Sequence, residues 1–353
     1  MDLKICVLIP AFNEAEVIAG TIGALRVSGF DCSDIFVADD RSTDKTADIA
    51  SGMGVVVYTL PENGGKAKAQ RHTISDLNLA SRYDYVIFLD GDTKVHPQFL
   101  TAMRNAAVES PDVDLFVGQV ESAKNDHIFS ALRAYDYTFG QEIIKRGQDN
   151  FGVIFVSPGC ASMYKSSSLS SMHIDSSTLA EDMDLTIQVH RRGGRVKYIP
   201  NAVVTTQDPS TLSCYLKQSL RWYRGFWQVM IKHNILSFSK KQRVDVYMLY
   251  LAIDALFFNR VFAFIVLSAL FSVSTVGMIW VVDVGIYALI AALVAIKVKR
   301  FDVLFKMPIY YWLSYINLYS FLKSFVEIVV CRKDILTWNK VKRYQFDSVT
   351  VHH

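Results

Sequence analysis

Charge is scarce in this sequence. Charged residues make up 20% of the 353 residues, and the formal net charge is only +3. This small net charge does not support nucleic-acid binding, which basic domains favour. Hydrophobic residues make up 51%, enough apolar surface to offset the entropy of folding, which excludes intrinsic disorder. A purely soluble globule is disfavoured as well, because soluble domains carry about 25% charged residues.

Paired cysteines are also missing, and no N-terminal targeting segment is expected. The five cysteines are dispersed without a Cys-x-x-Cys pair, so neither a zinc site nor a disulfide framework is indicated. Dispersed thiols are typical of a reducing compartment, which predicts that the first part of the chain faces the cytosol. Met1-Asp2-Leu3-Lys4 leads directly into an apolar run, and we expect no signal peptide or N-terminal anchor.

Charge and hydropathy divide the chain near residue 235. Residues 236–353 carry 14 Lys and Arg against 7 Asp and Glu, a net charge of +7, which leaves −4 for residues 1–235. An acidic first part and a basic, apolar second part are typical of a soluble domain joined to a membrane region. We therefore predict a cytosolic domain over 1–235, a membrane region over 236–330 and a basic cytosolic tail over 331–353.

Three apolar stretches make up the predicted membrane region. Val261–Val282 has 22 residues without a charge, enough to cross about 30 Å of hydrocarbon. Val284–Ile296 follows Asp283, and Met307–Val330 is flanked by basic residues on both sides. Because basic flanks favour the cytosolic side, we expect an even number of spans, most simply one hairpin within Tyr247–Ile296, with Asp283 near its external turn. The alternative is a buried helical core in a soluble protein.

Strands and helices alternate over the first 205 residues. This pattern predicts an α/β fold with a mostly parallel sheet and helices on both faces. Asn13 is expected to cap the first helix, with Glu16 three residues later. Ligands of such sheets bind at the carboxyl ends of the strands, and these ends carry polar clusters here. The predicted strands are Lys4–Pro10, Ile35–Ala38, Val55–Leu60 and Tyr85–Leu89.

Asp90-Gly91-Asp92 directly follows the fourth predicted strand. Two carboxylates separated by a glycine can turn toward one point, and Mg²⁺ or Mn²⁺ takes such oxygen ligands together with substrate phosphates. The alternative is a plain turn, in which Asp is common. The position of the two aspartates at a strand end favours the metal site over the turn.

Three further clusters each allow a functional and a structural interpretation. Asp39-Asp40 either binds a base or ribose, or caps a helix over Thr43–Ala50. Asn63-Gly64-Gly65-Lys66 either presents its lysine to a phosphate or is an ordinary turn. Glu181-Asp182 opens a helix, where it either supplies a general base or complements the helix dipole.

Gln218, Arg221 and Trp222 are spaced i, i+3 and i+4, so a helix places them on one face. An indole stacks on the apolar face of a sugar ring, while an amide and a guanidinium bond hydroxyls or phosphate. The pattern therefore predicts a sugar site. An amphipathic helix on a membrane surface is the alternative.

The ordered set of motifs resembles family-2 glycosyltransferases over roughly residues 3–230. Asp90-Gly91-Asp92 resembles the DxD motif of that family, and Ala180-Glu181-Asp182 resembles its TED motif with Ala in place of Thr. Gln218-Ser219-Leu220-Arg221-Trp222 is similar to the QxxRW motif of membrane-embedded cellulose, chitin and hyaluronan synthases. The matching segments before them are Ile9–Glu14, Ala38–Asp44 and Asn63–Lys66.

The resemblance implies a GT-A fold followed by an α-helical membrane region, and a nucleotide-diphosphate sugar donor, usually UDP-linked. It implies that Asp182 is the catalytic base and that Asp92 holds Mg²⁺ or Mn²⁺. A single base without a covalent intermediate should invert the anomeric centre and give a β-linked product. The acceptor would meet Glu181, Gln218, Arg221 and Trp222. The donor would meet Pro10, Asn13, Glu14, Asp39, Asp40, Lys66, Asp90 and Arg343.

The basic tail around Trp338 has two interpretations. It resembles the loop that closes over the nucleotide in hyaluronan-type synthases, with Arg343 and either Lys340 or Lys342 meeting the diphosphate. It is otherwise an anchor on anionic headgroups.

Three functions compete on this sequence. The first is a membrane-bound polysaccharide synthase that extends a glycan, which the QxxRW motif favours. The second is a transferase of single sugars to a polyprenyl phosphate or lipid, which the small membrane region favours. The third is a non-catalytic membrane assembly protein, against which the intact Asp90, Asp92 and Asp182 argue.

Overall fold

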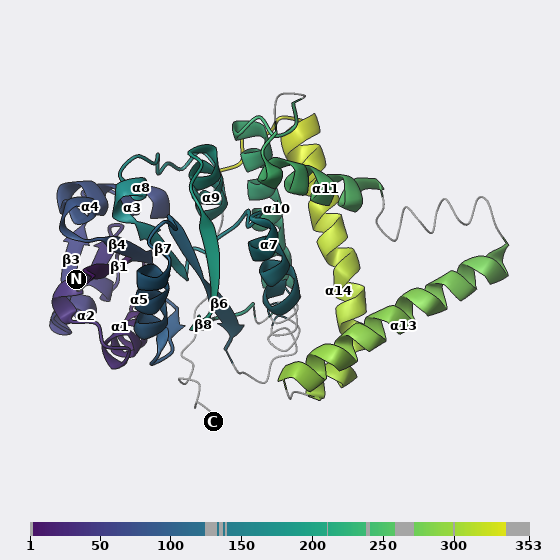
Figure 1. Cartoon of the computed structure of the whole chain (residues 1–353), viewed down its shortest axis with the longest axis horizontal. Coiled ribbons are helices and arrows are strands. Elements are labelled where there is room, and N and C mark those ends of the chain that lie inside the picture. The colour runs from purple at the N-terminus through teal and green to yellow at the C-terminus, as the bar shows by residue number, and fades with distance from the viewer. Residues whose placement is uncertain are drawn as a thin grey trace.

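One eight-stranded sheet forms the centre of the molecule, and long helices follow it in the chain (Figure 1). The computed structural model describes residues 3–123, 133, 137, 140–209, 211–237, 241–257, 272–298 and 301–336. The strands are β1 (Ile5–Ala11), β2 (Ile35–Asp39), β3 (Val56–Thr59), β4 (Tyr85–Phe88), β5 (Lys94–Val95), β6 (Leu115–Ser122), β7 (Ser162–Lys165) and β8 (Val196–Thr206).

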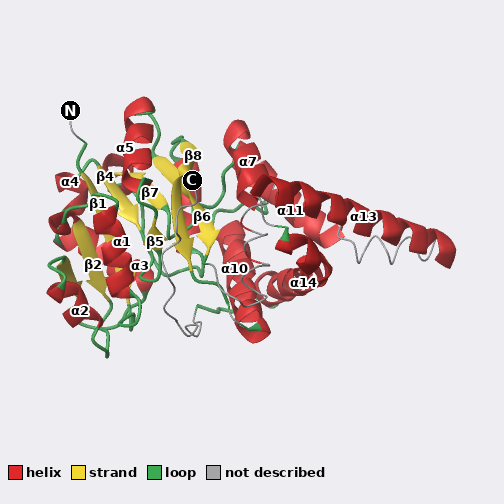
Figure 2. Ribbon diagram, turned by 90° about the horizontal axis from the view of Figure 1, so that it is seen from below, coloured by secondary structure: helices red, strands yellow, loops and turns green. Residues whose placement is uncertain are grey.

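Helices cover both faces of the sheet and then extend away from it (Figure 2). Those within the sheet domain are α1 (Ile18–Val27), η1 (Cys32–Asp34), α2 (Thr46–Gly52), α3 (Lys66–Asp76), α4 (Leu79–Arg82), α5 (Phe99–Glu109), η2 (Gly140–Lys145), α7 (Arg146–Phe151), α8 (Ser166–Leu169) and α9 (Glu181–Arg191). Those that follow are α10 (Leu212–Lys232), α11 (Arg243–Phe257), α13 (Val273–Val298), α14 (Asp302–Phe325) and η3 (Val326–Val330).

The sheet has the order β3-β2-β1-β4-β7-β6-β8-β5. The four strands expected from the sequence are confirmed as β1 to β4, and they pair in parallel. Beyond β4 the sheet is mixed, because β7 runs antiparallel to both of its neighbours and β5 runs antiparallel to β8. In the parallel half, the carboxyl ends of β1, β2 and β4 lie at one edge, which brings their polar clusters together.

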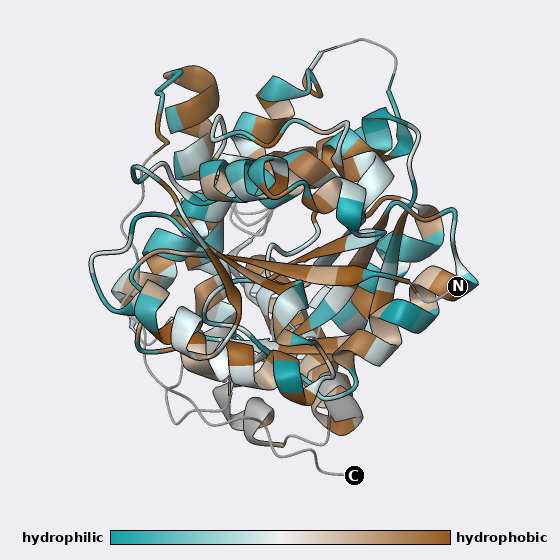
Figure 3. Ribbon diagram, turned by 90° about the vertical axis from the view of Figure 1, so that its left-hand side faces the viewer, coloured by the Kyte–Doolittle hydropathy of each residue, from teal (hydrophilic) through white to brown (hydrophobic). Residues whose placement is uncertain are grey.

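Strand β1 explains why the sheet needs helices on both sides. All seven of its residues are buried, and alternate side chains point to opposite faces. Val7 and Ile9 belong to one apolar cluster, and Cys6 and Leu8 belong to the other. Figure 3 shows the sheet nearly edge-on, with apolar strands between two layers of helices.

The expected cap at Asn13 is wrong. Helix α1 begins at Ile18, and its N-cap residue makes no side-chain cap bond. Asn13 instead has a φ of 53°, and its side-chain oxygen accepts a hydrogen bond from the Thr43 amide at 2.8 Å. Asn13 therefore ties the end of β1 to the loop after β2. Asn tolerates this left-handed backbone better than most residues.

Helix α10 links the sheet domain to the last long helix, α14. The Arg224 guanidinium pairs with Glu327 at 2.8 Å, and the Tyr215 hydroxyl donates to the Asn317 side chain at 2.9 Å. Trp227 packs against the ring of Phe321, with the two centroids 5.0 Å apart. Both polar and aromatic contacts therefore hold α14 along α10.

Two segments in the described part of the chain have the length and apolar composition of a membrane span, Ser274–Leu293 and Leu313–Val330. The expected turn at Asp283 is wrong, because α13 continues through this residue. The Tyr311 hydroxyl of α14 donates to the Asp283 carboxylate at 2.9 Å, so a neighbouring helix supplies this carboxylate with a hydrogen bond. Residues 258–271 of the expected hairpin lie outside the described residues, as do Trp338, Lys340, Lys342 and Arg343 of the tail.

Candidate active site

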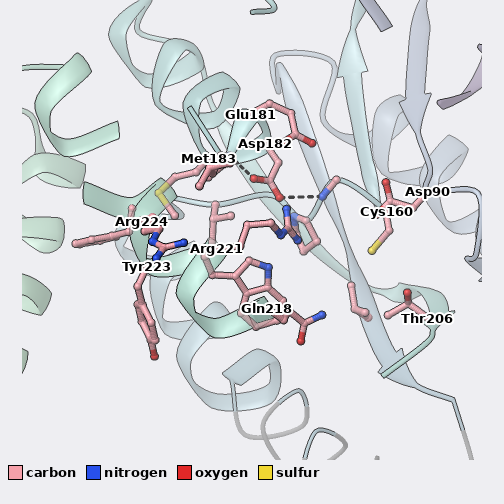
Figure 4. Close-up of a pocket in the computed structure, with 18 of the residues that line it drawn as sticks. Asp90, Cys160, Glu181, Asp182, Met183, Thr206, Gln218, Arg221, Tyr223 and Arg224 are labelled. Carbon is pink, nitrogen blue, oxygen red and sulfur yellow. Dashed lines mark hydrogen bonds between the residues drawn. The ribbon is translucent and has the colours of Figure 1, made fainter. Parts of the chain in front are cut away.

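A single cavity of about 1510 Å³ runs from the carboxyl ends of the parallel strands to helices α10, α11 and α14. Asp40, Lys66 and Asp90 line the end nearest the sheet, and Tyr315 and Phe321 line the far end. Figure 4 shows part of this cavity, with Asp182 across from the face of α10 that carries Gln218 and Arg221. Residues far apart in the sequence therefore line one continuous cavity.

The end nearest the sheet is built around the carboxylate of Asp40. Its two oxygens accept hydrogen bonds from the backbone amides of Gly64 and Gly65 at 2.8 and 2.7 Å. Burial raises the pKa of this carboxyl group, and the two amide bonds oppose that effect. The amides of the glycine turn thus hold Asp40, and the lysine that follows them lines the cavity together with Asn63 and Gly65.

Asp39 and Asp40 do not cap the next helix. Asp39 accepts a hydrogen bond from the Ser42 amide at 3.1 Å, which closes the loop after β2. Helix α2 begins at Thr46, whose amide bonds to the Asp44 carboxylate at 3.0 Å.

Lys66 bridges two carboxylates of the cavity. Its Nζ atom lies 2.6 Å from Asp90 and 2.9 Å from Glu181. Burial lowers the pKa of this lysine, but the nearby carboxylates outweigh it and hold the pKa well above the usual value. Gly159 permits this arrangement, because a Cβ atom there would stand 2.6 Å from the Lys66 nitrogen. The lysine is therefore a permanent cation between the DxD and ED motifs.

Asp182 stands at the start of α9, and its carboxyl group is an unusually weak acid. Its carboxylate accepts hydrogen bonds from the amides of Met183 at 2.8 Å and Gly159 at 3.2 Å. Burial, followed by the charge of Glu181, raises the pKa of Asp182 to about 6. Lys66 and Arg221 oppose this shift. A carboxylate with a pKa close to neutrality can take a proton efficiently, as a general base must.

Asp92 lies on the wall of the cavity and is buried. The turn that holds it is fixed on both sides, because the Thr21 hydroxyl donates to the Gly91 carbonyl at 2.8 Å. On the other side, Glu14 packs so closely that a Cβ on Gly91 would stand 3.0 Å from its side chain. A larger residue between the two aspartates would therefore require the Glu14 side chain to shift.

The predicted helical face at Gln218 is confirmed by α10, and Gln218, Arg221 and Trp222 all line the cavity. A buried arginine that the sequence analysis missed holds this face in place. The guanidinium of Arg133 donates to the Gln218 side chain at 2.7 Å and lies 4.7 Å from the centre of the Trp222 ring. Arg133 thus fixes the orientation of both the Gln218 amide and the Trp222 indole.

Gly225 fits α10 against the loop that carries the acidic pair. A Cβ atom at Gly225 would stand 2.5 Å from the Cβ atom of Ala180. Helix α10 and the start of α9 are therefore in direct contact, and the small residues at both positions make this possible.

The cavity lining contains most of the residues expected from the sequence. They are Pro10, Glu14, Asp40, Lys66, Asp90, Asp92, Glu181, Asp182, Gln218, Arg221 and Trp222. The side chains of Asn13 and Asp39 instead stabilise the loop after β2, and Arg343 lies outside the described residues. Sequence reasoning missed Arg133, Lys145, Gln148 and Gly159. Among these, only Gly159 stands in a pattern that sequence analysis could have used, because a Pro-Gly pair predicts a turn.

Metal ligands are few in the described part of the chain. No group of three or more His, Cys, Asp or Glu side chains converges there in a way that could hold an ion. Asp92 and Asp90 are the carboxylates of the DxD motif on the cavity wall. Since Mg²⁺ is commonly held by one or two carboxylates together with substrate phosphates, this donor set fits a metal that arrives with a diphosphate.

Comparisons with known proteins agree with this geometry. The chain is 28% identical to the poly-β-1,6-N-acetyl-D-glucosamine synthase of Staphylococcus aureus (strain COL) over 247 residues, which are 69% of this chain and 59% of the relative. It is 25% identical to the synthase of the same name from Staphylococcus epidermidis, with the same coverage. The chain thus matches less than two thirds of the length of these relatives.

A solved structure supports the fold. The mannosyltransferase PcManGT from Pyrobaculum calidifontis, solved in complex with GDP-Man and Mn²⁺, superimposes with a TM-score of 0.59 at 15% identity, covering 88% of this chain and 87% of its own. The family model described as "Glycosyltransferase like family 2" matches residues 3–225. Fold, cavity and sequence match together show that the chain belongs to this glycosyltransferase family.

Proposed function

We propose that this protein is an inverting glycosyltransferase that moves a sugar from a nucleotide-diphosphate donor to a growing β-linked glycan. The observation that carries the proposal is the shared cavity. It joins the Asp182 carboxylate, whose pKa is raised to about 6, to the Lys66–Asp90 pair on one side and to Gln218 on the other. A donor and an acceptor can therefore meet at one base.

The reaction follows from the positions of these groups. The donor lies with its diphosphate near Lys66 and its nucleoside near Asp40. Asp182 takes the proton from an acceptor hydroxyl as the oxygen attacks the anomeric carbon, and the bond to the diphosphate breaks with its electrons. Because attack and departure occur on opposite faces, an α-linked donor gives a β-linked product. Lys66 stabilises the negative charge of the departing nucleotide.

A divalent cation fits the donor end of the cavity. Asp92 would hold Mg²⁺ or Mn²⁺, with Asp90 facing the ribose or the same ion. The cation, when bound, would neutralise charge on the diphosphate. Mn²⁺ in the complex of the archaeal mannosyltransferase is consistent with this assignment.

The relatives suggest the sugar. Both are named as synthases of a β-1,6-linked N-acetylglucosamine polymer, and we therefore take UDP-N-acetylglucosamine as the donor to test first. A polysaccharide is preferred to a single-sugar product because the cavity continues past Asp182 along α10 to α14. Transfer of one sugar to a polyprenyl phosphate is the alternative, and product length distinguishes the two.

We further propose that residues 236–330 lie in a membrane and that the sheet domain and the tail face the cytosol. The two apolar segments Ser274–Leu293 and Leu313–Val330 support membrane insertion. In sealed vesicles of known orientation, protease added on the cytosolic side should cleave the tail, and cleavage only from the opposite side would contradict this topology.

The central experiment measures nucleotide release and product length with purified protein, labelled UDP-N-acetylglucosamine and Mn²⁺. We expect UDP release and a ladder of products in the wild type. Asp182→Asn should lower the rate by about 10²–10⁴-fold and leave UDP binding intact, because other residues hold the donor. Asp48→Asn, at an exposed position on α2, is the control and should behave as the wild type.

Three outcomes would count against the proposal. An Asp182→Asn rate within threefold of wild type would show that another group is the base. A product one sugar long on undecaprenyl phosphate would favour the lipid acceptor. Absence of UDP release with any nucleotide sugar would contradict the enzymatic function altogether.

A further inference from the structure

Two buried polar side chains on the cavity wall have no role in the reaction described above. Lys145 ends the π-helix η2 and is 7% exposed, and Gln148 follows one turn later in α7 and is 5% exposed. Both line the cavity. Burial of an ammonium and an amide costs free energy unless hydrogen bonds compensate it. The hydrogen bonds that each side chain makes therefore have to be compared with those it could make.

Each of the two side chains keeps unused hydrogen-bonding capacity. An ammonium has three donors, and within the described residues that of Lys145 makes one hydrogen bond, to the Val156 carbonyl at 2.8 Å. The Gln148 amide nitrogen bonds the Tyr247 hydroxyl at 3.2 Å, whereas its buried oxygen has no partner in the described structure. If the amide is rotated by 180°, the oxygen bonds the Tyr247 hydroxyl and the nitrogen is the atom without a partner in the described structure. In either case, one polar atom of Gln148 has no partner among the described residues.

The pair reaches from the surroundings of Asp182 to helix α11. Burial lowers the pKa of Lys145 to about 8, and the nearby Asp182 and Cys160 oppose this shift. Gln148 contacts Tyr247 of α11, and Phe155 beside it packs on Phe226 of α10, with ring centroids 6.4 Å apart. Lys145 thus lies near the base, and Gln148 lies against a helix that lines the same cavity.

We propose that Lys145 and Gln148 form a binding site for a sugar hydroxyl of the acceptor glycan. A hydroxyl both accepts and donates, so one sugar can accept from the ammonium and donate to the amide oxygen. The aromatic rings of Phe155 and Phe226, which line the same wall, suit the apolar face of a sugar ring. With the Gln148 nitrogen bonded to Tyr247, the free atom is the amide oxygen, to which a fully ionised phosphate has no hydrogen to give, so in this orientation the pair favours a glycan over a polyprenyl phosphate. The assignment rests on the proposed transferase function.

Direct binding tests this site separately from turnover. The probes are a β-1,6-linked N-acetylglucosamine tetramer, undecaprenyl phosphate in detergent, and UDP, each titrated calorimetrically into the full-length protein. Lys145→Met and Gln148→Met remove the polar groups at similar length. The control is Arg146→Met, which removes a charge from an exposed position on the same turn and outside the cavity lining. Melting temperatures are compared first, and Gln148→Met carries the test alone if Lys145→Met does not fold.

We expect Lys145→Met to weaken tetramer binding by about tenfold or more, because hydrogen bonds to charged groups are the stronger ones. Gln148→Met should weaken it by severalfold, and UDP affinity should stay within about twofold in every variant. Wild-type tetramer affinity in the folded variants would overturn the site. Binding of undecaprenyl phosphate that depends on Lys145 would overturn the hydroxyl assignment.

Sugar transfer is assayed in parallel, so that the transferase function and the Lys145–Gln148 site can each be refuted without the other. Tetramer binding that depends on Lys145 in a protein that releases no UDP would refute the transferase function and support the site. Normal polymer synthesis with tetramer binding that is independent of Lys145 would refute only the site.

Discussion

The ammonium nitrogen of Lys66 lies 2.6 Å from a carboxylate oxygen of Asp90. Two neighbouring motifs are thereby joined before any donor binds, and the same nitrogen reaches Glu181 at 2.9 Å. A diphosphate that enters this end of the cavity adds a third anion to a cation that two carboxylates already hold in position. Such preorganised charge lowers the cost of stabilising a leaving group.

The first prediction concerns this lysine. Lys66→Met should weaken UDP binding and lower the transfer rate by at least about tenfold, since an ion pair with the diphosphate and the neutralisation of Asp90 are both lost. Calorimetry and UDP release measure the two effects. Lys68→Met is the matched control on the same helix, because Lys68 pairs only with Glu62 among the described residues, near the surface. Equal losses in both variants would mean that general charge, and not Lys66, attracts the nucleotide.

The second prediction concerns pH. The base acts only when Asp182 is ionised, so with its pKa at about 6 the rate should fall about tenfold per pH unit below that value and level off above it. Glu181→Gln removes the neighbouring negative charge that raises this pKa, and the falling limb should move to lower pH. The profile of kcat against pH measures the shift. If the decrease of kcat at low pH occurs at the same pH in Glu181→Gln as in the wild type, ionisation of Asp182 does not cause it.

The third prediction concerns the metal. Excess EDTA should abolish transfer, and added Mn²⁺ or Mg²⁺ should restore it. Asp92→Asn should raise the metal concentration needed for half-maximal rate while the melting temperature without metal stays close to that of the wild type. Full turnover in EDTA would remove the metal from the mechanism.

The fourth prediction concerns the contact between α10 and the loop before α9. Gly225→Ala places a methyl group 2.5 Å from the Ala180 Cβ atom and 3.0 Å from the Ala180 backbone nitrogen, and overpacking of this kind costs about 1–3 kcal/mol. The melting temperature should fall, and the rate should fall with it, because the loop also carries Asp182. Gly147→Ala in α7 is the control, since a methyl group there meets no atom within 4 Å. Equal stability of the two variants would contradict this account.

The parallel half of the fold could be predicted from the sequence because its strands are continuous apolar runs that end in polar clusters. The antiparallel strand β7 could not, since Ser162–Lys165 has no such run and pairs with strands far away in the chain. Asn13 looked like a helix cap, but its actual partner, Thr43, is 30 residues away. Local patterns do not report partners of this kind.

The site was predictable where chemistry and spacing coincide, as at Asp182 and along the face of α10. Lys145 was not predictable, because one lysine in a helix is normally exposed and only the tertiary structure buries it. The turn expected at Asp283 failed for a related reason. A carboxylate interrupts an apolar run in the sequence, yet the hydroxyl of Tyr311 on α14 satisfies it within a continuous helix.

The far wall of the cavity belongs to α14, which contributes Tyr315, Asn317 and Phe321. If this helix lies in a bilayer, as we propose, its tilt responds to the thickness of the hydrocarbon layer. The acceptor end of the cavity would then change in width with the acyl chains around the protein, whereas the donor end is fixed by the sheet. A change in the acyl-chain length of the lipids should therefore alter the affinity for the acceptor and leave the affinity for the nucleotide constant.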